Sequence, residues 1–391
     1  MAQLRRHLFL KTALGILAGI LLCICPSFAA ESVVALPASG ANIVVTGDIM
    51  CLASQLSAAK VSGGWDFHYV FSMIQPILQN ADFAIGNLET PVAGAEKGVT
   101  AYNQAGNPIL NAPEEFVDAV ADAGFDMVVT ANNHSFDKGA YGLKNTLRLL
   151  NEKGIYHAGT YTSYYMQDNT PIVRINDISV AVLSYTQFVN TGTEAYKNSG
   201  ESYSLNLIDV EAIHSDIEAV RARHADFVIV YVHWGTENTR TLTKYQQETA
   251  KAIAEAGADV IIGSHPHVVQ AVQFLPVLDE SGGEKQVLVA YSLGNLVSSM
   301  PREINKDSLI LNLSIERAED GSMCLKEASY LCTTTASLKG KGFAILPSRL
   351  CIEKKISAST MKASIARTIE AVGGEINETA LFSFVTPDDF T

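Results

Sequence analysis

Five short apolar runs, each followed directly by polar residues, constrain the fold of this chain more than any other feature. They cover residues 42–46, 82–86, 126–130, 227–232 and 260–263, and they are rich in β-branched side chains. Strands that are apolar on both faces are typical of the buried sheets of α/β proteins. Helix-like stretches with ordinary start and stop signals stand at 114–123, 142–153, 209–224 and 246–255. The alternation predicts a largely parallel α/β core, to which 179–185 and 286–292 add two strands.

The residues that follow these runs carry metal-binding and acid–base side chains. In chain order they are Asp48, then Asn87 and Glu89, then Asn132, Asn133 and His134, then His233, and finally His265 and His267. Because ligands of open α/β sheets bind beyond the carboxyl ends of the strands, we expect these side chains to gather at one polar site. Side chains at i and i+2 of an extended chain point the same way, so His265 and His267 are expected to face one spot.

Carboxylate, carboxamide and imidazole groups together suit a divalent ion such as Mn, Fe or Zn. The predicted metal ligands are Asp48, Glu89, Asn133, His233, His265 and His267. His134 is predicted to act as a general acid or to stabilise developing charge. Asp137 is expected to orient it, although a local cap explains Asp137 equally well.

The pattern also assigns roles to three asparagines. Asn87 and Asn295 are the candidate substrate-binding residues, although Asn87 would serve as well to hold its loop and Asn295 to end a strand in a plain turn. Asn132 is interpreted as a left-handed turn residue.

The first thirty residues resemble an export signal. Arg5, Arg6 and Lys11 precede an uncharged run at 12–25, and small residues follow at 27 and 29. A cleaved signal peptide and a retained membrane anchor both remain open, although the run is short for a full span. Either one predicts an exported protein on the extracytoplasmic face of the cell envelope, secreted or anchored by its N-terminus.

The charge of the chain excludes some partners. The formal net charge is −13, and removal of the three leader cations would change it to −13 − 3 = −16. Such an acidic protein is a poor match for nucleic acid or anionic lipid. Of the cysteines beyond the leader, Cys51 is interpreted as a small buried residue. The others, Cys324, Cys332 and Cys351, could form a disulfide in an oxidising compartment, with no pairing fixed by the sequence.

The pattern changes after residue 298. Alternating runs at 309–316 and 323–332 flank the turn residues Glu319, Asp320 and Gly321, which predicts a β-hairpin, and 359–372 predicts an exposed helix. We therefore expect a signal peptide or anchor at 1–30, a catalytic-looking domain at 41–300, and a small C-terminal accessory region at 301–391.

Six segments, GDIM, GNLETP, ANNHSFDKG, VHWGTE, GSHPHVVQ and YSLGNLV, occur in this order. Together they resemble the CapA/PgsA-type poly-γ-glutamate capsule biosynthesis family, which is similar to the calcineurin-like metallophosphoesterase superfamily. The resemblance covers about residues 42–298 and implies a four-layer αββα sandwich at the cell envelope. It matches the superfamily motifs to Asp48, to Asn133 with His134, to His233, and to His265 with His267.

Two positions depart from the superfamily pattern. Its first motif is Asp-x-His, whereas this chain has Met50 in the third place, and its bridging Asp is replaced by a region with Asn87 and Glu89. Methionine is a poor ligand for hard divalent ions, so one metal ion rather than two is an open alternative.

Two functions follow from the resemblance. The first is a metal-dependent hydrolase of phosphoesterase type that acts on a phosphorylated or amide-linked polymer substrate. The second is a non-catalytic partner subunit of a complex that makes or exports the capsule polymer. The implied partners are poly-γ-glutamate or a related anionic polymer and the membrane proteins of capsule synthesis. An anionic polymer needs a basic or metal-lined groove, for which Lys97, Lys138 and Arg240 are the candidates.

Overall fold

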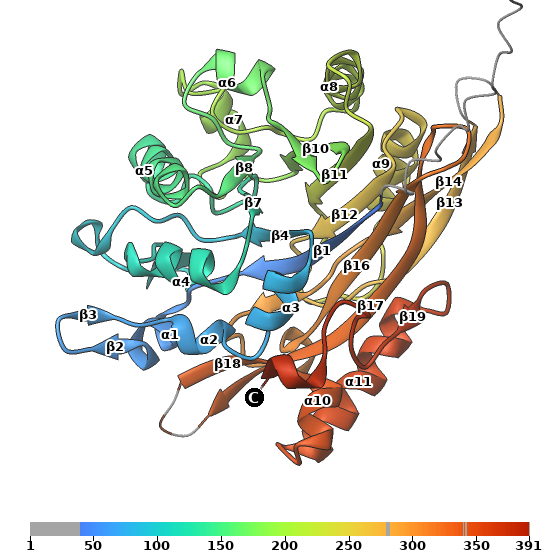
Figure 1. Ribbon diagram of the computed structural model, residues 1–391. Helices are drawn as coiled ribbons and strands as arrows, with labels where there is room; N and C mark the ends of the chain where they lie inside the picture. The colour runs from blue at the N-terminus through green and yellow to red at the C-terminus, as the bar shows by residue number, and fades with distance from the viewer. Residues whose placement is uncertain (1–39, 279–281, 339, 341, 391) are drawn as a thin grey trace, which may run out of the picture. The chain divides into compact units, whose positions relative to one another are not determined.

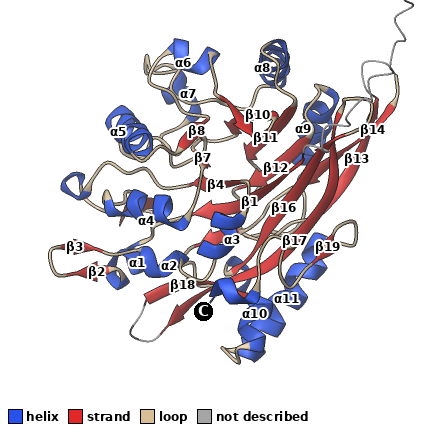
Figure 2. Ribbon diagram, in the orientation of Figure 1, coloured by secondary structure: helices blue, strands red, loops and turns tan. Residues whose placement is uncertain are grey.

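The computed structural model describes residues 40–278, 282–338, 340 and 342–390. The predicted leader at 1–30 lies outside the described residues. Within the described part, two β-sheets lie at the centre and the longer helices lie outside them (Figures 1 and 2).

The larger sheet, sheet A, has nine strands with a parallel half and an antiparallel half. Its spatial order is β18 (Gly342–Pro347), β17 (Met323–Leu338), β16 (Asp307–Arg317), β1 (Gly40–Ile49), β4 (Phe83–Leu88), β7 (Met127–Val129) and β8 (Tyr156–Ala158). Two short strands join it at the side: β15 (Asn295–Val297) pairs with β1, and β19 (Asn377–Glu378) pairs with β17.

The smaller sheet, sheet E, has six strands in the order β13 (Val272–Leu278), β14 (Glu284–Ala290), β12 (Val260–Ser264), β11 (Phe227–His233), β10 (Ile178–Thr186) and β9 (Ile172–Ile175). Its inner four strands are parallel, and β9 and β13 are antiparallel edges. Two small hairpins lie outside these sheets. They pair β2 (Lys60–Val61) with β3 (Gly64–Trp65) and β5 (Ala101–Tyr102) with β6 (Pro108–Ile109).

Residues along the inner strands alternate between two buried environments. On β11, Ile229 faces the core between the two sheets, and its neighbour Val230 faces the core under the outer helices. The same alternation places Ile43 of β1 between the sheets and Val44 against the helices of the other side. A strand that is buried on both faces must be apolar throughout, which explains the unbroken apolar runs of the sequence.

The helices form the two outer layers. Those that cover sheet A are α1 (Ala53–Ala58), α2 (His68–Phe71), α3 (Gln75–Asn80), α4 (Glu115–Ala123) and α5 (Gly139–Glu152). Sheet E is covered by α8 (Val210–Ala222) and α9 (Lys244–Glu255). The order helix, sheet, sheet, helix confirms the predicted four-layer αββα sandwich. The short helices α6 (Tyr164–Asp168) and α7 (Thr193–Lys197) and the 3-10 turns η1 (Ala95–Lys97) and η2 (Glu303–Asn305) lie in connections. A further 3-10 turn, η3 (Pro387–Phe390), is the last of the described elements.

The C-terminal part of the chain extends sheet A. The predicted hairpin forms as β16 and β17, and β16 pairs with β1 along residues 40–46. The helices α10 (Ser348–Glu353) and α11 (Ala358–Val372) follow. The sequence predicted an exposed helix at 359–372, but α11 buries one face, including Ile365 and Val372, against the core where sheet A continues past sheet E. The predicted domain boundary at residue 300 stays a prediction.

Two further sequence-based expectations concern single features. The described cysteines, Cys51, Cys324, Cys332 and Cys351, are all free thiols, so no disulfide joins the late cluster. Cys51 is fully buried, and burial raises the pKa of its thiol, which agrees with a packing role. None of the described helices has both the length and the apolar composition that a membrane span needs.

We expect His157 on β8 to make the fold sensitive to acid. Burial lowers the pKa of His157 from 6.5 to about 4, and its Nδ1 has no hydrogen-bond partner. Because the pKa of His157 is lower in the folded protein than in the unfolded chain, the neutral imidazole contributes to stability above pH 6.5. This contribution is lost as the pH falls through 4. The loss amounts to roughly 3 kcal/mol.

Urea denaturation of His157→Leu at pH 7, 5 and 4 should show a pH dependence that is smaller by about this amount. His214→Leu, at an exposed position of α8, is the matched control and should keep the acid sensitivity of the parent because it leaves His157 in place. An unchanged pH dependence in His157→Leu would contradict the assignment.

Candidate functional site

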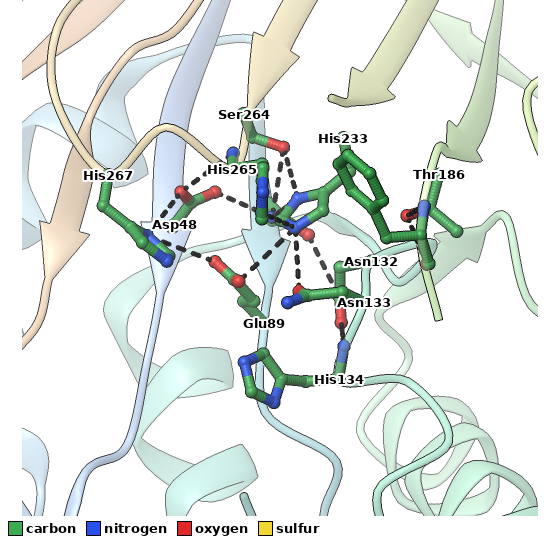
Figure 3. A network of polar contacts seen from close by, with 12 residues as sticks. Asp48, Glu89, Asn132, Asn133, His134, Thr186, His233, Ser264, His265 and His267 are labelled. Atoms are coloured by element: carbon green, nitrogen blue, oxygen red, sulfur yellow. Dashed lines mark hydrogen bonds and ion pairs between the residues drawn. The ribbon is translucent and has the colours of Figure 1, made fainter. Parts of the chain in front are cut away.

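The predicted polar residues lie together at the carboxyl ends of strands from both sheets. Asp48, Glu89 and Asn133 come from the ends of β1, β4 and β7 in sheet A, and His233, His265 and His267 come from the ends of β11 and β12 in sheet E. Figure 3 shows these side chains pointing toward one another from both sheets. The site thus lies between two sheets rather than along the edge of one.

Asp48 is fixed at the end of β1 by its neighbours. Its backbone N–H donates to the carbonyl of Gly294 at 3.0 Å, and Asp48 is in register with Asn295 of β15. This contact requires glycine at position 47, because a Cβ there would lie 1.9 Å from the oxygen of Gly294. The Asn87 amide donates to Oδ1 of Asp48 at 2.8 Å, which orients the carboxylate.

Glu89 is the least compensated charge of the site. The residue is fully buried, and neither carboxylate oxygen has a hydrogen-bond partner. Oε1 lies 3.4 Å from Nε2 of His233, and Oε2 lies 3.8 Å from Nδ1 of His267, so the carboxylate lies between two imidazoles (Figure 3). Burial, followed by the charge of Asp48, raises the pKa of Glu89 well above its usual range.

His233 presents one nitrogen to several ligand-type atoms. Its Nδ1 lies 2.8 Å from the Ser264 hydroxyl, a contact that fixes the ring. Its Nε2 lies 2.9 Å from Oδ1 of Asn133 and 3.2 Å from Nδ1 of His265. Glu89 lies near the same nitrogen, so a single hydrogen on Nε2 could be donated to only one of three neighbouring acceptor atoms. A cation at this place would attract all three. Burial lowers the pKa of His233 and of His265, which favours the neutral imidazoles that metals bind.

His265 and His267 reach the site by a different route from the one the sequence predicts. Both have positive φ, 93° and 57°, and follow the end of β12. Their convergence therefore results from left-handed backbone in a loop and not from side-chain alternation along an extended strand. The ring centroids are 5.9 Å apart. Positive φ costs energy in a residue with a Cβ, and such strain is concentrated at functional sites.

The donor atoms fit a divalent cation in more than one place. Three groups have ligand atoms within 4.8 Å of one another: Glu89 with His233 and His265, Asp48 with Glu89 and His267, and Glu237 with His265 and His267. Glu89, whose oxygens have no hydrogen-bond partner, belongs to the first two groups and could contribute a ligand atom to either. Carboxylate, imidazole and carboxamide donors suit Mn, Fe and Zn alike.

His134 and Asp137 form a pair beside these groups. Nδ1 of His134 lies 2.6 Å from Oδ2 of Asp137, and both side chains are almost fully buried. The backbone N–H of Leu110 also donates to Oδ2, at 2.7 Å, which holds the carboxylate in place. A carboxylate at Nδ1 fixes the ring and leaves Nε2 for proton transfer. The geometry thus gives Asp137 the orienting position that was predicted, while catalysis by the pair stays a prediction.

The structure places the other predicted asparagines behind the ligands. Asn87 contacts Asp48, and Oδ1 of Asn295 lies 2.9 Å from Nδ1 of His267; both asparagines are fully buried. Neither lines the cleft described below, so substrate contact by them stays a prediction without geometric support. The left-handed role expected of Asn132 is wrong: its φ is not positive, and its amide instead donates to Oδ1 of Asn87 and the carbonyl of Leu88.

Sequence reasoning missed three residues of the site. Ser264 contacts His233, although its position directly after the apolar run at 260–263 does not by itself indicate a role in the site. Asn190 lies 3.0 Å from Nδ1 of His134 and follows β10, so the rule applied to the other strand ends would have found it. Glu237 belongs to the quoted segment VHWGTE and joins the third group of possible ligands.

A cleft of about 600 Å³ opens beside these side chains. Asn133, His134, Asp137, Glu237 and His267 line it on the polar side, and Met50, Leu52 and Met300 are among the apolar lining residues. The basic candidates do not line it. Lys97 lies over the Tyr141 ring, Lys138 donates to the Lys97 carbonyl, and Arg240 pairs with Glu370.

Comparison with known proteins gives the chain a family. Residues 42–300 match the family described as "Bacterial capsule synthesis protein PGA_cap". The chain is 35% identical over 271 residues to "Capsule biosynthesis protein CapA" of Bacillus anthracis, covering 69% of this chain and 62% of that protein. It is 28% identical over 254 residues to "PGA biosynthesis protein CapA" of Bacillus subtilis (strain 168), covering 64% and 62%. The chain thus spans 62% of the length of these relatives.

Solved structures with a similar course of the chain include the calcineurin-like phosphoesterase YfkN of Bacillus subtilis and the NAD nucleotidase NadN of Haemophilus influenzae. The first has a TM-score of 0.44 and 17% identity and covers 85% of this chain and 98% of its own. The second has a TM-score of 0.45 and 12% identity and covers 89% and 65%.

We expect Glu89→Gln to remove most of the stabilisation that a divalent cation gives the protein. The substitution keeps the shape of the side chain and removes the negative charge of Glu89, which belongs to two of the three groups of possible ligands. A cation at 100 times its Kd stabilises a protein by about 2.7 kcal/mol, so Mn²⁺ should raise the Tm of the parent clearly and that of the variant little. Without the cation, the variant should be at least as stable as the parent, because it no longer holds a buried carboxylate that must take up a proton to be neutral.

Thermal unfolding with and without Mn²⁺, followed by circular dichroism, measures both effects. Glu211→Gln, at an exposed position of α8, is the control and should keep the full rise in Tm. Equal rises in the parent and in Glu89→Gln would exclude Glu89 as a ligand.

Proposed function

The chain belongs to the bacterial capsule synthesis protein family PGA_cap, and on that basis we propose that it is a metal-dependent phosphoester hydrolase of capsule polymer synthesis. The names of the relatives, a capsule biosynthesis protein and a PGA biosynthesis protein, support poly-γ-glutamate as the polymer of the pathway. The leader-like sequence at 1–30 supports a place at the cell envelope, next to the membrane proteins of capsule synthesis.

One observation carries the metal dependence of the proposal: a fully buried carboxylate, Glu89, has no hydrogen-bond partner and lies between His233 and His267. A purely structural role would pair this carboxylate with donors, because unpaired buried charge is costly. The residues that would hold divalent cations are Asp48, Glu89, Asn133, His233, His265 and His267, with Glu237 at the edge of the set. The chemistry that such cations supply when bound is polarisation of a phosphoryl oxygen and activation of water.

The protein's own acid–base group is His134. Its Nδ1 faces Asp137 at 2.6 Å, so the ring is held with Nε2 available, and the residue lines the cleft. In hydrolysis, a water oxygen bonds to phosphorus and the bond between phosphorus and the leaving oxygen breaks. His134 gives the proton at Nε2 to the leaving oxygen and regains one from the attacking water through solvent. The products are an alcohol and a phosphate.

The alternative is a partner subunit without catalysis. Met50 favours it, because this side chain packs in an apolar cluster with Leu52, Leu110 and Met300 and offers no ligand where the superfamily motif has histidine. The two functions differ in what His134 does, since a partner subunit has no need of a general acid.

We expect His134→Gln to lower kcat for p-nitrophenyl phosphate or its diester by about 10²–10⁴-fold with Mn²⁺ present. The rise in Tm with Mn²⁺ should persist, because His134 is not among the grouped ligands. Asp137→Asn should lower kcat less, since it changes only the orientation of the ring.

His214→Gln, at an exposed position of α8, is the control and should keep full activity. Chelation should abolish activity and added Mn²⁺ should restore it. If His134→Gln supports full capsule production in cells while deletion of the chain abolishes it, the partner-subunit function is correct and the hydrolase proposal fails.

A further inference from the structure

We propose that the cleft selects a phosphoester whose leaving group is uncharged and partly apolar, and that it rejects a leaving group that carries a free carboxylate. This inference rests on the proposed function and concerns the substrate class of the same site. It implies that the reaction acts on a phosphorylated compound other than the glutamate polymer, whose repeating carboxylates the cleft does not accommodate.

One wall of the cleft is apolar. Met50 and Leu52, after β1, pack with Leu110 and with Met300, after β15, and three of the four, Met50, Leu52 and Met300, line the cleft. The β5–β6 hairpin adds Tyr102, which is 54% exposed. An exposed aromatic ring in the same lining as the buried Met50 and the partly buried Met300 can cover an apolar or aromatic group, because burial of apolar surface is favourable.

The polar part of the cleft lining is neutral or acidic. Its charged side chains are Asp137 and Glu237, and among the described residues that line the cleft none is lysine or arginine. The remaining polar groups there include the amides of Asn103, Asn107 and Asn190. A carboxylate placed in this space would lose water and meet the exposed carboxylate of Glu237 without gaining a lysine or arginine as a partner, so the cleft discriminates against it.

The basic residues near the cleft are turned to other partners or lie outside its lining. Lys138 follows Asp137 in sequence, but its Nζ donates to the carbonyl of Lys97. Arg302 follows the lining residue Pro301 and is exposed, and it is not part of the lining. Arg302 is thus the residue to test as a source of positive charge at the rim.

The test compares binding of two phosphonates that cannot be hydrolysed, benzylphosphonate and 4-carboxybenzylphosphonate, to the full-length protein loaded with Mn²⁺. Titration calorimetry measures both affinities and does not depend on activity. We expect benzylphosphonate to bind about tenfold more tightly, because the two ligands differ only in the carboxylate.

Asn107→Lys then places a cation at the cleft. Asn107 is exposed, and only its backbone takes part in the contacts of its loop, so the substitution should fold. The variant should bind 4-carboxybenzylphosphonate several-fold more tightly than the parent does and so reduce the difference between the ligands. Ala222→Lys, at an exposed position of α8, adds the same charge elsewhere and should leave the difference unchanged.

The outcomes separate the two proposals. Equal or tighter binding of the carboxylated ligand by the parent overturns the substrate inference and leaves the proposed function intact. In that case, loss of this binding in Arg302→Ala would identify Arg302 as the residue that recruits the carboxylate. If Mn²⁺ binds but neither phosphonate does, or if Mn²⁺ does not bind, the proposed function fails and the inference fails with it.

Discussion

The site depends on one electrostatic constraint, the buried carboxylate of Glu89. The protein surrounds this charge with imidazoles and with Asp48 but gives its oxygens no hydrogen-bond donor. Such a charge is stable only if it is neutralised, by a proton or by a cation. The crowding of Nε2 of His233 by acceptor-type neighbours has the same explanation. A cation that satisfies Glu89 would therefore also satisfy His233, and the site acts as one unit.

Backbone geometry brings these groups together. Gly47 lets the segment around Gly294 approach the end of β1, which sets Asp48 beside Asn295. In the other sheet, His265 and His267 adopt positive φ after β12. The two sheets are joined across their common core by the hydroxyl of Tyr231, which donates to the carbonyl of Thr46 at 2.9 Å, two residues from Asp48. Packing between the sheets thus controls the distance between the two sets of ligands.

The cleft next to the site refines the expected substrate. A chain that works on an anionic polymer was expected to present basic residues, yet Lys97, Lys138 and Arg240 are engaged elsewhere. Met50, which departs from the superfamily motif, contributes to an apolar wall instead. The residue that departs from the motif at a possible ligand position therefore forms part of the cleft lining. Membership of a capsule synthesis family is thus compatible with a cleft whose described lining residues include no lysine or arginine.

The sequence by itself determined the alternation of strands and helices and the candidate ligands at the strand ends, because buried strands must be apolar and their ends carry the polar groups. The αββα class followed from the family resemblance of the six segments. It also marked Met50 as a departure. Only the tertiary structure decided that the ligands come from two sheets, that His265 and His267 converge through left-handed backbone, and that Asn87 and Asn295 lie behind the ligands. Ser264 and Glu237 carried no decisive signal, because their roles arise from distances between segments remote in the chain, which local sequence patterns do not encode.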